Sequence, residues 1–330
     1  MKVAVVILNW NGKALLEEFL PSVVKNSAEA EVYVADNAST DDSVAFLENR
    51  FPQVKIIQNK INGGFAKGYN DALQHLEEDI FVLLNSDVEV TPNWLPPLLK
   101  EFEKDKNVAA VQPKILDYRR KDHFEYAGAA GGFIDAFGYP YCRGRIFDTL
   151  EKDRGQYDDI VDVFWATGAC MAIRKKDFMD AGGFDEDFFA HQEEIDLCWR
   201  LFNHRKKVKA AGNSTVYHLG GGTLNNMHPR KTFLNFRNSL FTLVKNAPKK
   251  GLLTKILFRL ILDAAAGIRL LLLLTPSHTA AIIRAHFSFY RHLKKMWKKR
   301  EKFQNNEKYY HQTTVVGAYY LKGIKKFSKL

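Results

Sequence analysis

The fold is decided by one stretch, Ile80-Phe81-Val82-Leu83-Leu84-Asn85-Ser86-Asp87-Val88-Glu89-Val90. Residues 80–84 form an apolar run bounded by polar residues, which predicts a strand buried on both faces of a sheet. In an open α/β sheet, ligands bind in the crevice outside the carboxyl ends of the strands. The carboxylate of the turn Asn85-Ser86-Asp87 is therefore well placed to hold Mg²⁺ or Mn²⁺ against a diphosphate. The alternative is that these residues form only a turn beside the helix start at Thr91-Pro92.

Strand and helix patterns alternate around this stretch. Residues 3–8, 31–35 and 54–57 are further strand patterns, and a helical pattern follows each of them. Such alternation implies crossover connections, so we expect an α/β fold with a mostly parallel sheet and flanking helices. Downstream, residues 108–111 form a short strand, residues 124–145 form a hairpin packed through its aromatics, and residues 163–173 form a strand interrupted at Thr167-Gly168.

Three polar turns are expected to meet at one edge of this sheet, namely Asn9-Trp10-Asn11, Asp36-Asn37 and Asn85-Ser86-Asp87. An acid at the end of the second strand can accept hydrogen bonds from a ribose or a base. Gly63 and Gly64 let the backbone approach a ligand, and the helix that begins there offers free N–H groups to phosphate. The first turn lacks the G-x-G-x-x-G motif of nicotinamide dinucleotide enzymes, which argues against that class.

Composition and cysteine usage indicate a folded protein of the cytoplasm. The chain has 330 residues and is 46% hydrophobic, enough for one large α/β domain plus an appendage. Residues 1–8 indicate a first strand rather than a signal peptide. Cys142, Cys170 and Cys198 are widely spaced and odd in number, which favours reduced thiols over a disulfide or zinc framework.

A second stretch with chemical character is the helix pattern through Ile195 and Leu201. Glu193 and Glu194 fall in its first turn, where the helix dipole favours acids with or without chemistry. Asp196 and Arg200 are four residues apart and are expected to form a surface ion pair.

The ordered motifs resemble those of glycosyltransferase family 2, the inverting nucleotide-sugar enzymes with the GT-A fold, and most closely its rhamnosyltransferase-like branch. The resemblance covers about residues 1–240 and is carried by I-L-N-W-N-G, V-A-D-N-A-S-T-D-D, N-x-G-G-F-A-x-G-x-N and L-L-N-S-D, followed by the segment from Phe184 to Arg200. It implies a transferase that moves a sugar to a hydroxyl of a lipid-linked or cell-envelope glycan.

The resemblance also implies a set of donor and metal residues. Asp87 would bind the divalent metal, with Asn85 standing where the family usually has a first Asp, and Glu89 as an outer ligand. His218 would be a further metal ligand, and the glycines at 220–222 a lid over the diphosphate. The donor-binding residues would be Asn9, Trp10, Asp36, Asn37, Gly63, Gly64, Asn85, Ser86, Trp165 and Gly168. Trp10 is equally compatible with a core aromatic that caps the sheet.

The same resemblance places the general base on Glu194, with Glu193 as the alternative. Inverting transfer is a direct displacement, so a carboxylate must take the proton of the attacking hydroxyl while a metal stabilises the departing diphosphate. Two other classes stay open. One is a binding protein or pseudoenzyme that retains the fold. The other is a sugar nucleotidylyltransferase, although its Gly-rich basic loop is absent after the first strand.

Positive charge is concentrated at the C-terminus. Residues 1–245 hold 30 Lys and Arg against 35 Asp and Glu, whereas residues 246–330 hold 18 against 3. We therefore expect a glycosyltransferase domain over residues 1–245 and a basic, amphipathic helical segment over residues 246–330.

This segment is expected to lie on an anionic membrane surface, on the inner face of the cell membrane. Along residues 252–274, four charged residues share one arc of an otherwise apolar helix, namely Lys255, Arg259, Asp263 and Arg269. A second helix from Pro276 carries Ile282, Phe289, Leu293, Met296 and Trp297 on one face and basic residues on the other. The alternative is that both helices pack on the protein. No nucleic-acid recognition module is evident.

Overall fold

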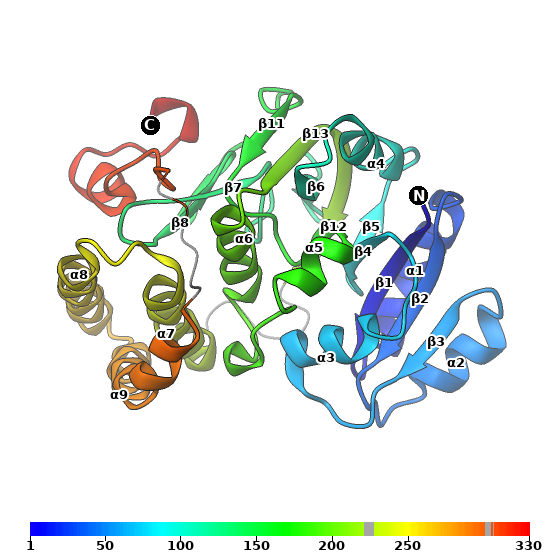
Figure 1. Cartoon of the computed structure of the whole chain (residues 1–330), viewed down its shortest axis with the longest axis horizontal. Coiled ribbons are helices and arrows are strands. Elements are labelled where there is room, and N and C mark those ends of the chain that lie inside the picture. The colour runs from blue at the N-terminus through cyan, green and yellow to red at the C-terminus, as the bar shows by residue number, and fades with distance from the viewer. Residues whose placement is uncertain (221–227, 301–304, 306) are drawn as a thin grey trace.

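The computed structural model describes residues 1–220, 228–300, 305 and 307–330. These residues form a central nine-stranded sheet with helices on both faces, a small four-stranded sheet and a C-terminal group of three long helices (Figure 1). The expected α/β fold with a helical appendage is confirmed. The order of the central sheet is β11-β13-β6-β12-β4-β1-β2-β3, with β5 paired to β13 at the side.

The first half of the chain forms the parallel part of the sheet. The strands β1 (Val3–Asn9), β2 (Glu31–Asp36), β3 (Lys55–Gln58) and β4 (Ile80–Asn85) pair in parallel, β1 between β2 and β4. The crossover helices are α1 (Lys13–Asn26), α2 (Ser43–Arg50) and α3 (Gly64–Leu73). The four strands predicted here are confirmed: β1, β2 and β4 are largely buried, and β3, at the edge of the sheet, is partly exposed.

The second half of the sheet is mixed. Strand β12 (Cys170–Arg174) lies antiparallel between β4 and β6 (Val108–Asp117), while β13 (Lys207–His218) runs parallel to β6. The strands β5 (Val88–Val90) and β11 (Ile160–Val163) pair antiparallel with β13. Parallel pairing is therefore less extensive than the N-terminal alternation suggests, because the chain reaches β12 through the irregular segment 118–169 rather than a crossover helix. The strand expected over 163–173 is divided, since residues 164–169 leave the sheet.

The two faces of the central sheet carry separate apolar cores. On one face, α1, α2 and α4 (Leu95–Lys104) cover Val5, Ile7 and Val82. On the other face, α3, α5 (Lys175–Asp180) and α6 (Glu193–Asn203) cover Val6, Phe81 and their neighbours. All three cysteines are free and buried, as expected for reduced thiols.

The segment 124–145 forms the packed aromatic hairpin that was expected. Its strands are β7 (Gly132–Ile134), β8 (Pro140–Cys142) and β9 (Arg145–Ile146), and β10 (Thr149–Leu150) completes the small sheet. Phe133 stacks on Tyr141 with ring centroids 5.8 Å apart. The ring centroid of Phe327 lies 5.5 Å from that of Phe133, so the end of the chain packs against this hairpin (Figure 1).

The C-terminal helices are α7 (Pro229–Asn246), α8 (Leu252–Leu272) and α9 (Pro276–Lys298). Three apolar residues of α9 expected on a membrane face, Ile282, Phe289 and Met296, are buried, and the last two pack in one cluster with Phe241 of α7. For these residues the membrane expectation is wrong and the alternative of packing on the protein holds. Leu293 and Trp297 remain exposed. The division of the chain at residue 245 stays a prediction.

Two of the four charged residues on the α8 arc, Arg259 and Asp263, face the protein, whereas Lys255 is half-buried and Arg269 is exposed. Arg259 Nε lies 2.7 Å from Asp263 Oδ1, and both side chains are buried. The Tyr139 hydroxyl donates to the same carboxylate at 2.8 Å. The apolar side of the helix is the exposed one, with Leu272 77% exposed. Within the described part of the chain, no helix is both long and apolar enough to cross a membrane.

Replacing Arg259 by Met should destabilise the fold, because Asp263 then stays buried without its cation. We expect the free energy of unfolding in urea to fall by about 3–5 kcal/mol. The control Lys298→Met removes an exposed cation from α9 and should change this free energy by less than about 0.5 kcal/mol. Equal effects of the two substitutions would contradict a buried ion pair.

Candidate active site

The predicted metal ligands Asp87 and His218 lie side by side at the carboxyl edge of the sheet. Asp87 follows β4, and His218 ends β13, where it pairs with Val88 of β5. His218 Nε2 lies 3.1 Å from Asp87 Oδ1, and the Leu219 N–H donates to the Asp87 carbonyl at 3.0 Å. Both side chains are buried. The short strand β5 thus holds the turn after β4 against the end of β13, so that Asp87 contacts a residue 131 positions later in the chain.

A second carboxylate, Glu125, stands behind the imidazole. Its Oε2 lies 3.2 Å from His218 Nδ1, so the ring lies between two acids. Burial disfavours the charged imidazole, but the carboxylates of Glu125 and Asp87 outweigh it and raise the pKa of His218 to about 10. Burial likewise opposes ionisation of Asp87, yet His218 keeps the pKa of that carboxyl below its usual range. Sequence reasoning missed Glu125, which lies in an irregular segment and carries no motif.

Metal ligands bind in their deprotonated form, so a cation here would displace the proton of His218, and the donor set then fits a hard divalent cation. Asp87 and His218 would supply a carboxylate and an imidazole, and the second carboxylate, Glu125, orients the far nitrogen of the ring. Metal-binding histidines are commonly held in place by such a second carboxylate. Across the described residues, no group of three or more His, Cys, Asp and Glu side chains is arranged to hold a metal ion. Two protein ligands suit Mg²⁺ or Mn²⁺, which complete their shells with water and phosphate oxygens. Glu89 points elsewhere, to Lys121 Nζ at 2.9 Å.

The first two polar turns meet as expected. Asn9 Nδ2 donates to Asp36 Oδ1 at 3.1 Å, and the Ser39 N–H donates to the other oxygen of Asp36 at 2.9 Å. Asn9 Oδ1 is buried and accepts no hydrogen bond from the described residues. Trp10 is 48% exposed, so its alternative role as a core aromatic is wrong.

Asn37 connects the second turn to the glycine loop. Its Nδ2 donates to Asn62 Oδ1 at 3.0 Å and to the Gly64 carbonyl at 3.2 Å. Gly63 and Gly64 begin α3, and Gly64 has a φ of +80°. A Cβ on Gly64 would lie 2.8 Å from the carbonyl oxygen of Phe189, so this backbone contact requires glycine.

The remaining predicted donor residues fall into two groups. Asn85 Nδ2 lies 3.4 Å from His218 Nε2, Ser86 is partly exposed beside it, and Gly168 lies against the ring of Phe65 in α3. These three residues border the Asp87 turn or the glycine loop. Trp165 is buried and donates its ring N–H to the Phe133 carbonyl at 3.0 Å, a position that favours packing over a donor contact.

Glu193 and Glu194 begin α6, and neither Oε2 atom finds a hydrogen-bond donor among the described residues. Burial raises the pKa of Glu194 to about 7. Burial, and next the charge of Glu194, raise the pKa of Glu193 well above its ordinary value. With a pKa of about 7, Glu194 is partly ionised at neutral pH and can then accept a proton.

The ion pair expected on the surface of this helix is internal. Asp196 and Arg200 are both buried, with Arg200 Nε 3.0 Å from Asp196 Oδ2. Lys245 Nζ of α7 reaches the same oxygen at 2.8 Å. The expectation of a solvated pair is wrong, because α7 covers this face of α6.

Glu125 and Glu194 both act electrostatically on the buried Cys142 thiol of β8. Burial chiefly raises the pKa of the Cys142 thiol, and the charges of both Glu125 and Glu194 add to this effect. The glycines expected to form a lid continue into residues 221–227, which lie outside the described residues.

Residues 4–181 match the sequence profile described as glycosyl transferase family 2. The chain is 27% identical over 216 residues to N-acetylglucosaminyl-diphospho-decaprenol L-rhamnosyltransferase of Mycobacterium tuberculosis, covering 60% of this chain and 69% of that protein. It is 23% identical over 208 residues to rhamnosyltransferase WbbL of Escherichia coli, covering 60% and 76%.

The fold is similar to those of solved glycosyltransferases of the GT-A type. Mannosyltransferase PcManGT of Pyrobaculum calidifontis, in complex with GDP-Man and Mn²⁺, matches with a TM-score of 0.54 and 16% identity, over 88% of this chain and 87% of that chain. GalNAc-T7, with UDP, GalNAc and Mn²⁺, matches with a TM-score of 0.57 and 17% identity, over 74% of this chain and 48% of that chain. Since the family profile covers more than half of its length, the chain belongs to glycosyltransferase family 2 and is of the rhamnosyltransferase-like kind.

Proposed function

We propose that this chain is a metal-dependent, inverting glycosyltransferase that moves a sugar from a nucleoside diphosphate sugar to a hydroxyl of a lipid-linked or cell-envelope glycan. The observation that carries the proposal is the pair Asp87 and His218 at the carboxyl edge of the sheet, together with Glu194, whose pKa is raised to about 7. Family membership supports transfer of a glycosyl group.

Glu194 is the proposed general base. Its ionised form accepts the proton of the acceptor hydroxyl as that oxygen attacks the anomeric carbon. Burial and the charge of Glu194 raise the pKa of Glu193 well above its ordinary value, so ionising both carboxyls of the pair together is disfavoured. This assignment favours Glu194 over Glu193.

The donor is proposed to lie between the three polar turns and the start of α3. Asp36 and Asn9 face the nucleoside, and the N-terminus of α3 faces the diphosphate. Asp87 and His218 would hold a divalent cation there, and that cation would stabilise the charge of the departing diphosphate. The mycobacterial relative is named as an L-rhamnosyltransferase acting on a diphospho-decaprenol, which makes an L-rhamnose donor and a polyprenyl diphosphate sugar the first substrates to test.

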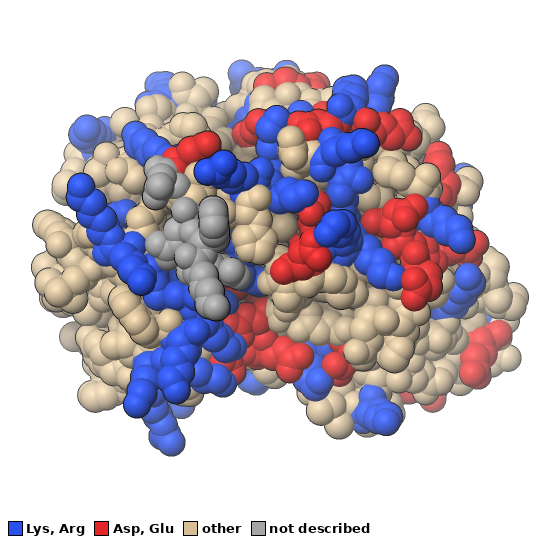
Figure 2. All heavy atoms as spheres, in the orientation of Figure 1, with Lys and Arg blue, Asp and Glu red and all other residues tan. Residues whose placement is uncertain are grey.

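Residues 246–330 are proposed to hold the enzyme on the anionic inner face of the cell membrane. The outer faces of α8 and α9 expose Leu257, Ile261, Leu272 and Phe287, the last of these 72% exposed. Arg284, Arg291, Lys294 and Lys298 are exposed on α9 beside its aromatic residues. Figure 2 shows Lys and Arg gathered over the α9 region, next to an uncharged area over α8. Exposed apolar and aromatic side chains flanked by cations suit a surface of anionic lipid.

Substituting Glu194 by Gln should abolish most turnover. With an L-rhamnose donor and Mn²⁺, we expect kcat to fall by about 10²–10⁴-fold, and Glu193→Gln to cost less. Because Glu194 must be ionised and its pKa is raised to about 7, wild-type kcat should rise with pH through pH 7. Chromatographic assay of transfer and of donor hydrolysis over pH 5–9 checks both points. Absence of turnover in wild type and variant alike, over a panel of nucleotide sugars, would indicate a pseudoenzyme.

Substituting Asp87 by Asn should weaken Mn²⁺-dependent binding of the nucleoside diphosphate. We expect calorimetry to show at least about a tenfold loss of affinity, and Glu125→Gln a loss of about 10–100-fold through His218. The control is Glu89→Gln, which removes a neighbouring carboxylate already paired with Lys121 and should bind like wild type. Equal affinities of Asp87→Asn and Glu89→Gln would place the metal elsewhere.

Substituting Leu272 and Phe287 together by Asp should release the protein from vesicles. We expect wild type to sediment with vesicles rich in phosphatidylglycerol but weakly with pure phosphatidylcholine, and less at high salt because exposed charges are screened. Met179→Asp changes an exposed apolar residue on α5 and serves as the matched control. Sedimentation of the double variant at the wild-type level would refute the assignment of this face.

A further inference from the structure

The segment before the catalytic glutamates has an unusual backbone. We call residues 185–192 the base loop, since it ends directly before Glu193. Phe189, His191 and Gln192 have φ angles of 66°, 69° and 73°, in the left-handed region that non-glycine residues seldom adopt. Such residues persist only where the surrounding structure fixes them firmly.

The fixing group is the side chain of Asn238, which is fully buried in α7. Its Nδ2 donates to the carbonyls of Phe188 at 3.1 Å, Ala190 at 2.9 Å and His191 at 2.7 Å. One amide group thus serves three carbonyls spread over four residues of the base loop, with its two hydrogens shared among them. Its Oδ1 accepts from Arg237 Nε at 2.8 Å, which fixes the orientation of the amide.

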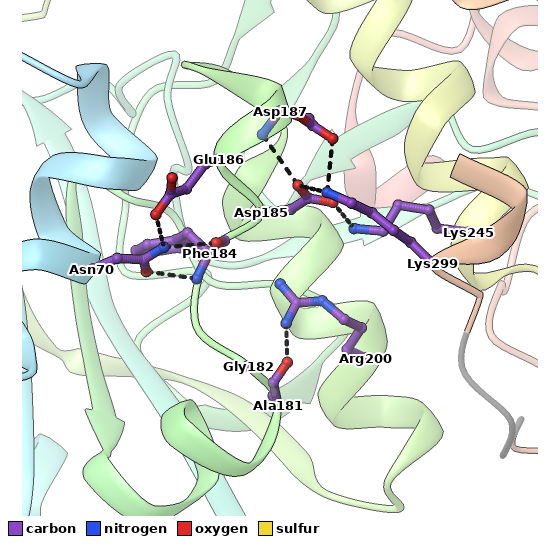
Figure 3. A pocket seen from close by; sticks show the side chains of 10 residues that line it. All are labelled: Asn70, Ala181, Gly182, Phe184, Asp185, Glu186, Asp187, Arg200, Lys245 and Lys299. Atoms are coloured by element: carbon purple, nitrogen blue, oxygen red, sulfur yellow. Dashed lines mark hydrogen bonds and ion pairs between the residues drawn. The ribbon is translucent and has the colours of Figure 1, made fainter. Parts of the chain in front are cut away.

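Other contacts hold the first half of the base loop. Arg237 Nη2 donates to the carbonyls of Asp187 and Phe188, both at 3.1 Å. Figure 3 shows Lys245 of α7 and Lys299, just after α9, pointing at Asp185, while Asn70 of α3 holds Phe184 from the other side. A cavity of about 500 Å³ lies among these residues, and no predicted donor, metal or catalytic residue lines it. These groups restrain the start of the base loop, whereas Asn238 restrains its end.

The base loop also touches the donor side of the site. The Phe65 N–H, in the first turn of α3, donates to the Phe189 carbonyl at 3.0 Å. Gly64 meets the same carbonyl closely enough to exclude a Cβ. The left-handed residues therefore connect the helix start proposed to face the diphosphate with the helix start that carries Glu194.

We infer that Asn238 is a positioning residue, which fixes the base loop and so sets Glu194 relative to the sugar donor. This inference rests on the proposed role of Glu194 as general base. It adds a function for α7 that no site motif indicated, because Asn238 contacts the base loop through backbone carbonyls. Its effect reaches the reacting atoms through the base loop and the first turn of α6.

The test compares Asn238→Ala and Asn238→Ser with wild type. Serine keeps one donor, so its defect should be the smaller. We expect kcat to fall on the order of 10–100-fold in Asn238→Ala with the donor KM changed less than about threefold, because misplacing a catalytic group affects chemistry more than binding. The matched control is Ser239→Ala, which removes a buried hydroxyl on the next residue of α7 that contacts Arg259 rather than the base loop.

The pH profile separates positioning from general destabilisation. The charge of Glu194 acts on Glu193 and Cys198 of α6 and on Cys142 of β8. Releasing the base loop admits water to Glu194, so the rise of kcat with pH should move at least about 0.5 unit lower in Asn238→Ala. A smaller folded fraction would lower kcat equally at all pH values without moving this limb.

Amide hydrogen exchange tests the clamp without any assay of activity. Exchange at residues 189–196 should be faster in both Asn238 variants and unchanged in Ser239→Ala. Wild-type exchange rates there, or an unshifted pH limb with kcat within about threefold of wild type, would overturn the inference. If wild type shows no turnover with any donor, the proposed function fails, and the exchange data still decide whether Asn238 fixes the base loop.

Discussion

The contact between Asp87 and His218 depends on the whole second half of the sheet. In the strand order, β12 and β6 lie between β4 and β13, so the two residues meet only because the chain after β4 continues as β5 and pairs with the end of β13. The backbone bond from Leu219 to Asp87 fixes this crossing. A site at this edge therefore requires β6, β12 and β13 to pair in the correct register. The residues that suggest the site in the sequence lie beside short turns and carry no sign of this long-range requirement.

Helix α8 reverses the usual distribution of polar and apolar side chains. Arg259, Asp263 and Lys299 form ion pairs within the protein, while the apolar side of α8 faces outward. An exposed apolar face is costly in water, and this arrangement is expected where the surroundings are themselves apolar. The same group of helices supplies Asn238 and Lys245 to the region of α6. Membrane contact and positioning of the base are thus proposed for different faces of one structural unit.

The parts of the fold that could be predicted are those whose pattern is local. Strands β1 to β4 are apolar runs with turn residues at both ends, and no other element fits them. The full length of strand β13 was not predicted, because Lys207, Lys209 and Asn213 interrupt its apolar residues. The direction of β12 was not predictable either, because it depends on the path of the long segment that precedes it.

Periodicity showed that Arg259 and Asp263 share one face of a helix, but it did not show which part of the protein that face contacts. Likewise, spacing joined Asp196 to Arg200 without revealing that α7 buries the pair. The sequence placed Asp87, His218 and Glu194 on separate turns, whereas Glu125 and Asn238 act through contacts that only the folded chain creates.

The buried cysteines have a practical consequence. Cys142, Cys170 and Cys198 are the three cysteines of the chain, and burial raises the pKa of each thiol, so thiolate is scarce and shielded at neutral pH. Maleimide reagents should therefore leave the native protein almost unlabelled. A single cysteine engineered on the outer side of α9 would then carry a polarity-sensitive fluorophore with little background, turning that helix into an optical reporter.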